Sequence, residues 1–261
     1  PGDVLGALCT LDPLLQKLNP RATLIPNTRL RALQRLGRQP LLSLGVAIVS
    51  LIIATVIGFI VAMGRGSKHR VAQWLALAYT WFFRAIPALL VLLIMWNALP
   101  QLLPGLRAWG YNPFVAASIG LGLVEAAFMA EIIRSSLSSV DEGQGLAGRA
   151  LGMKPGTVMS KILVPQAIRI ALPPTTNEFI GLIKYSSLAS VISLRELLTT
   201  AQVGVNITFR YAEYYTVAII YYLVIVSIIT VIQMQIERRF HWASSVPTKK
   251  RRSLKLVGAA R

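Results

Sequence analysis

Two long stretches of the chain, residues 41–63 and 214–236, consist mostly of apolar side chains and contain no charged residue. A bilayer core about 30 Å thick is crossed by roughly 20 apolar residues in a helix. Each stretch is therefore long and apolar enough to span a membrane.

Three further apolar stretches, residues 72–99, 114–133 and 168–194, have the length of spans but carry charged positions. Among these positions are Arg84, Glu125, Glu131, Glu178 and Lys184. Charged groups exposed to lipid are costly, so we expect these side chains to face protein or a water-filled path. The pattern predicts an all-α integral membrane protein with five core transmembrane helices.

Composition supports this interpretation and excludes several function classes. Charged residues make up 14% of the chain, against about 25% in a soluble protein. The net charge of +17 comes from basic residues between the apolar stretches and at the chain ends, which indicates membrane anchoring and not nucleic-acid binding. One cysteine and two histidines allow no intrachain disulfide and indicate neither a metal site nor a catalytic constellation. No GxxxxGK[ST] motif is present, so we expect no ATP bound by this chain.

The basic residues also predict an orientation, with one conflict. The loops on the side of the C-terminus and the C-terminal tail hold most of them, which predicts a cytoplasmic C-terminus. We expect an N-terminal segment 1–40, a transmembrane domain 41–239 with a cytoplasmic loop 135–165, and a basic tail 240–261. Five spans place the basic N-terminal segment outside. Either an amphipathic helix over residues 29–38 lies on the membrane surface, or an upstream span precedes the segment.

Prolines interrupt two of the predicted spans. Pro87 lies within the second stretch, and Pro173 and Pro174 lie within the fourth. Each proline removes a helical hydrogen bond, so we expect a bend at both places. Such bends are either packing kinks or openings in a transport path, and the nearby charges of Arg84 and Glu178 keep the second alternative open beside the first.

The polar loop between the third and fourth stretches predicts a short amphipathic helix. Asp141 and Glu142 stand at its start, where acidic residues complement the helix dipole. Ala147 and Leu151 recur at helical spacing, and Gly152 is placed to end the helix. Such a helix requires either a groove on a partner protein or the membrane surface to cover its apolar face.

This loop resembles a known family. Gly143-Gln144, Ala150-Leu151-Gly152 and residues 164–169 (VPQAIR) are similar to the "GQ-x-EAA-x-ALG … LPQA" loop of ABC-importer permeases. Residues 171–197 resemble the polar amino acid (histidine, glutamine, arginine) branch of that family, as do FFRAIPALL and EAAFMAEIIR upstream. The chain departs from the family pattern at Leu146, where the loop glutamate belongs, and at Glu125, where a small or polar residue is usual.

The resemblance implies a type I ABC importer permease fold in the bacterial inner membrane. It implies two cytoplasmic ATPase subunits that bind ATP and Mg, a second permease subunit, identical or homologous, and a periplasmic or lipid-anchored substrate-binding protein. No cofactor is expected on this chain. The residues implied in coupling to the ATPase are Gly143, Gln144, Leu146, Ala147, Gly148, Ala150, Leu151, Gly152 and Pro165.

The candidate substrate path uses the polar groups of the spans, because an amino acid carries both an ammonium and a carboxylate group. Its candidates are Arg84, Glu125, Asn177, Glu178, Lys184, Ser186 and Ser187. For each of these residues the alternative is a buried ion pair or hydrogen bond between helices, above all for Arg84, Glu131 and Lys184. The i, i+3 spacing predicts a pair between Glu131 and Arg134. The rival classes are a gradient-driven transporter, a membrane enzyme and a scaffold. The residues favour each of them less than they favour an ABC-importer permease.

Overall fold

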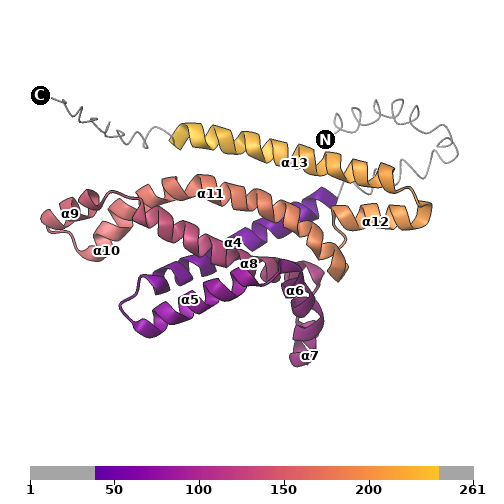
Figure 1. Ribbon diagram of the computed structural model, residues 1–261, viewed down its shortest axis with the longest axis horizontal. Coiled ribbons are helices and arrows are strands. Elements are labelled where there is room, and N and C mark those ends of the chain that lie inside the picture. The colour runs from indigo at the N-terminus through magenta and orange to yellow at the C-terminus, as the bar shows by residue number, and fades with distance from the viewer. Residues whose placement is uncertain (1–38, 241–261) are drawn as a thin grey trace, which may run out of the picture.

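The computed structural model describes residues 39–240, and over that range it is helical with no β-strand (Figure 1). The predicted interfacial helix at 29–38 and the basic tail from residue 241 onward lie outside the described residues. The helices are α4 (Gln39–Arg65), α5 (Arg70–Ala85), α6 (Ala88–Leu93), α7 (Leu99–Leu102), α8 (Pro113–Ser138), α9 (Glu142–Ala150), α10 (Pro155–Val158), α11 (Val164–Tyr185), α12 (Leu197–Thr208) and α13 (Tyr211–Phe240).

Helix α8 forms the centre of the structure and packs along α4 at short range. The contact is close because both helices present small residues, as is usual where helices associate in a membrane. A Cβ atom added to Gly58 of α4 would lie 2.8 Å from the Cβ of Met129, and one added to Gly122 of α8 would lie 2.8 Å from Cγ2 of Ile53. The hydroxyl of Ser50 adds a buried hydrogen bond to the carbonyl of Ser118, at 3.1 Å.

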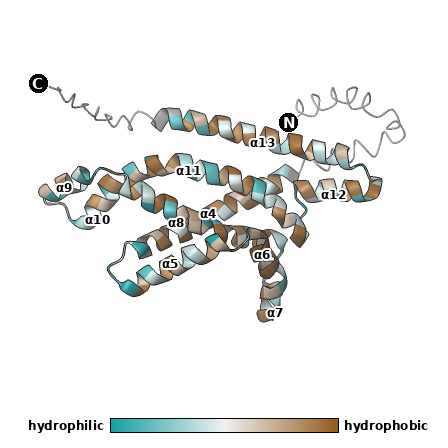
Figure 2. Ribbon diagram, viewed as in Figure 1, coloured by the Kyte–Doolittle hydropathy of each residue, from teal (hydrophilic) through white to brown (hydrophobic). Residues whose placement is uncertain are grey.

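Three helices are long and apolar enough to cross a membrane, and they match three of the predicted spans. They are Pro40–Arg65, Pro113–Ser138 and Tyr211–Glu237. The apolar colour of α4 and α13 in Figure 2 contrasts with hydrophilic residues at the turn between α4 and α5 and on α9. That turn, α9 and the C-terminal end of α13 lie at the same end of the view in Figure 1.

The predicted span 72–99 is a broken helix. Helix α5 ends at Ala85, α6 begins after Pro87, and the two segments meet at an angle of 99°. Ile86 adopts an extended conformation because the ring of a following proline disfavours the helical region. The predicted bend at Pro87 is confirmed, and counting the bent pair as one span gives four candidate spans, so the expected five are not confirmed.

The predicted fourth span, residues 168–194, has a different structure from the one expected. Helix α11 continues through Pro173 and Pro174 without interruption and ends at Tyr185, where a 3₁₀ helix (Ser186–Ile192) follows. The proline pair therefore does not interrupt the helix as Pro87 interrupts the second span. Neighbouring helices and local adjustments can satisfy the backbone groups that a proline frees, so a packed helix tolerates it.

Candidate functional site

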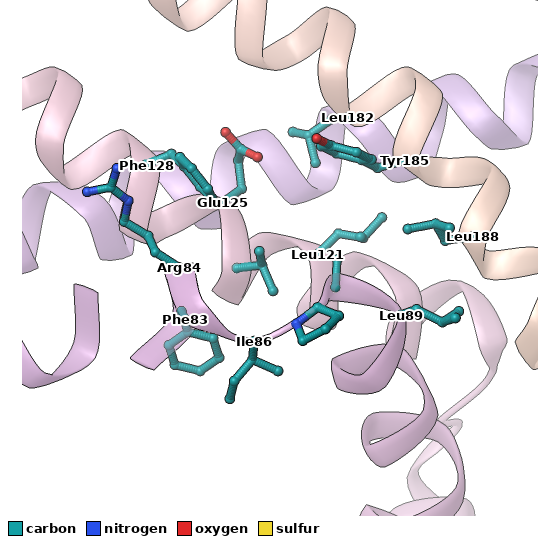
Figure 3. A pocket seen from close by; sticks show the side chains of 13 residues that line it. Phe83, Arg84, Ile86, Leu89, Leu121, Glu125, Phe128, Leu182, Tyr185 and Leu188 are labelled. Carbon is teal, nitrogen blue, oxygen red and sulfur yellow. The ribbon is translucent and has the colours of Figure 1, made fainter. Parts of the chain in front are cut away.

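The break at Pro87 opens a cavity of about 310 Å³ between the α5–α6 bend, α8 and α11. Its walls are mainly apolar, with Phe83 from α5, Leu121 and Phe128 from α8, and Leu182 from α11 (Figure 3). Arg84 and Glu125 are its only charged lining residues in the described part of the chain. The cavity therefore brings together two of the seven candidates for the substrate path.

Glu125 is buried in the middle of α8, with 2% of its surface exposed. Helical spacing places it on the same face of α8 as Leu121 and Phe128, which is the face that meets the cavity. Within residues 39–240 its Oε1 atom has no hydrogen-bond partner. The carboxyl group of Glu178, on α11, lies within interaction range of the Glu125 carboxyl, although Glu178 does not itself line the cavity. The Glu125 carboxyl at the cavity therefore has a second carboxyl group close enough to interact with it electrostatically.

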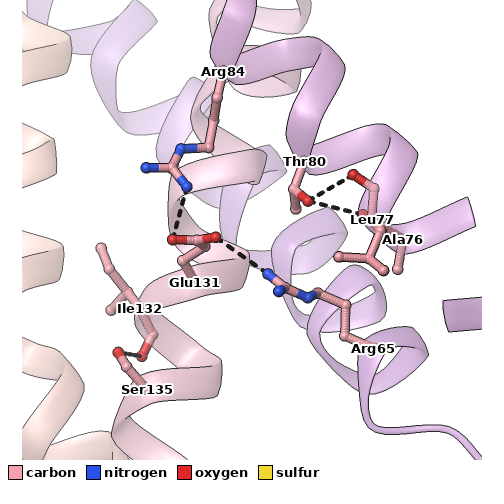
Figure 4. A network of polar contacts seen from close by, with 8 residues as sticks. All are labelled: Arg65, Ala76, Leu77, Thr80, Arg84, Glu131, Ile132 and Ser135. Atoms are coloured by element: carbon pink, nitrogen blue, oxygen red, sulfur yellow. Dashed lines mark hydrogen bonds and ion pairs between the residues drawn. The ribbon is translucent and has the colours of Figure 1, made fainter. Parts of the chain in front are cut away.

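Arg84 is held by a network of ion pairs at the end of α5 (Figure 4). Its Nη1 lies 2.8 Å from Oε2 of Glu131, and Nη1 of Arg65 lies 3.2 Å from the other carboxylate oxygen. The Arg84 guanidinium also lies over the ring of Phe128, 5.5 Å from its centroid. The predicted pair between Glu131 and Arg134 does not form, because the two arginines from α4 and α5 occupy both oxygens of Glu131.

The four remaining candidates for the substrate path do not line the cavity. Asn177 accepts a hydrogen bond from Nε2 of Gln233 on α13, at 3.4 Å. Lys184 is exposed. The hydroxyls of Ser186 and Ser187 donate to the carbonyls of Ile183 and Lys184, three residues earlier in the chain.

Glu196 is a buried polar residue that the sequence patterns did not single out. It is fully buried before α12 and caps that helix by accepting hydrogen bonds from the backbone N–H groups of Leu198 and Thr199. The hydroxyl of Tyr222 on α13 donates to it at 3.0 Å, and that of Ser43 on α4 at 3.4 Å. Burial raises the pKa of Glu196, and these hydrogen bonds oppose that shift in part. The only local signal was an acidic residue directly before an apolar helical run.

The predicted loop helix is present as α9. The side chain of Asp141 caps its first turn by accepting from the Gly143 N–H. Gly152 ends the helix with φ +75°, and the N–H of Met153 bonds back to the carbonyl of Gly148. This is the ending that a glycine after a helix favours.

Helix α9 packs on the following segment through a glycine and leaves apolar side chains uncovered. A Cβ atom on Gly148 would lie 2.9 Å from Cδ1 of Ile162 and 3.0 Å from Cγ2 of Val158, so only glycine fits this contact without a shift. Leu146 and Leu151 are 64% and 80% exposed. These two leucines form an exposed apolar edge on the loop, and no other part of the described chain covers it.

Comparison with known proteins identifies relatives of the chain. Residues 54–242 match the family described as binding-protein-dependent transport system inner membrane component. The probable amino-acid ABC transporter permease YckA of Bacillus subtilis is 38% identical over 195 residues, which cover 75% of this chain and 84% of that protein. The arginine transport system permease ArgU of Corynebacterium glutamicum is 37% identical over 222 residues, 81% of this chain and 70% of that protein. A chain in a crystal structure of an amino acid ABC transporter with histidines has a TM-score of 0.72 at 29% identity, covering 83% of this chain and 99% of that one.

Proposed function

Because this chain belongs to the family of binding-protein-dependent transport system inner membrane components, we propose that it is the membrane subunit of an ATP-driven importer of polar amino acids, with the type I importer fold. In this proposal two cytoplasmic ATPase subunits bind ATP and Mg, and an external binding protein delivers the amino acid. A second permease subunit, identical or homologous, completes the path through the bacterial inner membrane. The basic turn between α4 and α5, at the same end of the molecule as α9 and the end of α13, supports a cytoplasmic C-terminus.

The observation that carries the proposal is the cavity at the broken span. A polar amino acid presents a carboxylate and an ammonium group to its site, and the cavity offers a guanidinium from Arg84 and a carboxyl from Glu125 between apolar walls. A buried polar atom without a partner is costly, so the unpartnered Oε1 of Glu125 favours a ligand that donates to it. Asn177, Lys184, Ser186 and Ser187 contribute to helix packing or lie exposed in this proposal.

The exposed edge of α9 supports a docking role for the loop. A short helix gains little stability from its own turns, and Leu146 and Leu151 leave apolar surface that a groove on an ATPase subunit would cover. Leu146 stands where the family pattern has glutamate, so the proposed contact is apolar at that position. Movement of the docked helix would then pass to α11 through α10 and the π-helical turn Met159–Leu163.

ATP-driven exchange between inward-facing and outward-facing states requires that nucleotide and binding protein stabilise different states. The bend between α5 and α6 gives the path a non-helical point at which the two halves of a span can move separately.

The proposal is tested by reconstituting the chain with its ATPase and binding protein in liposomes. We expect a polar amino acid, added with the binding protein, to stimulate ATP hydrolysis and to accumulate inside vesicles in an ATP-dependent manner. Uptake that follows an imposed ion gradient and is indifferent to ATP would refute the proposal, as would the absence of stimulation by every polar amino acid.

A further inference from the structure

From the charges around the cavity we infer that the substrate is an amino acid with a positively charged side chain, such as lysine or arginine. This inference rests on the proposed function and narrows it from polar amino acids to one charge class. It makes Glu125 the residue that determines specificity for the side chain.

The arginine end of the site has an excess of positive charge. Arg65 and Arg84 share the single carboxylate of Glu131, so this cluster has a net charge of +1. The pair with Glu131 uses Nη1 of Arg84, whereas an arginine has five N–H donors. The cluster therefore has both the charge and the donors to bind one substrate carboxylate.

The carboxyl end of the site has an excess of negative charge when both of its glutamates are ionised. Glu125 and Glu178 lie within interaction range of each other, and within the described residues no cation forms an ion pair with either. Two ionised carboxylates at short distance repel each other, and a cation between them removes the repulsion. With both ionised, the two charged lining residues Arg84 and Glu125 and their charged neighbours Arg65, Glu131 and Glu178 together sum to −1, so a ligand of net charge +1 balances this group.

A basic amino acid supplies that charge in the arrangement required. Its carboxylate matches the arginine cluster, and its two cationic groups match the two carboxylates. Its methylene chain suits the apolar wall of Leu121, Phe128 and Leu182. A neutral amino acid would leave one carboxylate desolvated without a partner, which is a strong ground for rejection.

The competing arrangement is a proton shared between Glu125 and Glu178, which would make the site neutral and indifferent to the charge of the side chain. The two arrangements predict different ligand preferences. Since an external binding protein has a selectivity of its own, the preference must be measured on the membrane complex without it.

The experiment measures direct binding of radiolabelled lysine, arginine and glutamine to the purified full complex in detergent, without binding protein. We expect the wild-type complex to bind lysine or arginine at least tenfold more tightly than glutamine. Glu125→Gln should weaken lysine or arginine binding at least about 30-fold. This is the lower end of the affinity loss usually caused by removing one member of a buried ion pair. Glutamine binding should change less than about threefold.

Three further variants make the result decisive. Glu125→Asp keeps the charge and should retain a preference for the basic amino acids, and Glu178→Gln should reduce that preference. Glu213→Gln is the matched control, because this carboxylate at the start of α13 does not line the cavity. Equal wild-type affinity for glutamine and lysine would overturn the inference, even if Glu125→Gln failed to assemble. That result together with ATP-driven glutamine uptake would leave the proposed function intact, whereas failure of every amino acid to bind and to stimulate hydrolysis would refute both.

Discussion

The close contact between α4 and α8 predicts that Gly58→Ala destabilises the protein although alanine is the better helix former. An added Cβ atom would lie 2.8 Å from the Cβ of Met129, 3.0 Å from the backbone nitrogen of Ala130 and 3.1 Å from the carbonyl oxygen of Ala126. None of these atoms belongs to the mobile end of a side chain. One helix must therefore move away from the other, and the packing around it must adjust.

The magnitude follows from two opposing contributions. Overpacking a tight interior costs about 1–3 kcal/mol, and the fixed backbone contacts put this site at the upper end. Replacing glycine by alanine within a helix contributes up to about 1 kcal/mol in favour of folding. We expect a net loss of roughly 1–2 kcal/mol in the free energy of unfolding.

The assay is thermal unfolding of the purified complex, with Gly45→Ala as the matched control on the same helix. At Gly45 the nearest contact of an added Cβ is 3.4 Å, to the ring of Phe114, which is an ordinary van der Waals distance. We expect Gly58→Ala to melt several degrees below wild type and Gly45→Ala to melt at or above it. Equal melting temperatures for the two variants would refute the argument that α4 and α8 are in contact through glycine.

Three further predictions concern the polar contacts and the loop. Glu196→Ala should lower the free energy of unfolding by about 2–4 kcal/mol, because it leaves buried donors unsatisfied and removes the cap of α12. Glu196→Gln keeps an acceptor and should lower the free energy of unfolding by less, as measured in the same thermal unfolding experiment. Glu131→Gln should lower the free energy of unfolding by about 1–2 kcal/mol, a value between those of exposed and buried ion pairs, because the Arg84 and Glu131 side chains are 45% and 36% exposed. The difference in melting temperature from wild type should be smaller at high salt. Leu151→Asp should melt within a degree or two of wild type, because the side chain is 80% exposed. It should reduce the stimulation of ATP hydrolysis at least about tenfold, because it removes apolar surface from the proposed docking contact, and unchanged stimulation would contradict the docking.

Local patterns were sufficient for features whose partners are near in sequence. The length of an apolar stretch indicates whether a helix can cross a bilayer, and three such stretches are helices of the required length. Asp141 and Gly152 delimit α9 through hydrogen bonds that reach no more than five residues. Pro87 restricts the residue directly before it, so the break was also a local prediction.

Partners far apart in sequence could be assigned only from the tertiary structure. Glu131 pairs with Arg65 and Arg84, 66 and 47 residues away, and not with the nearby Arg134. The reason is that α4 and α5 pack against α8 and place one guanidinium group beside each carboxylate oxygen of Glu131. The same packing leaves Glu125 beside a cavity and buries Glu196 among three helices, and no periodicity distinguishes these two glutamates. Helical spacing shows which residues share a face, whereas the neighbour of that face depends on how distant segments pack.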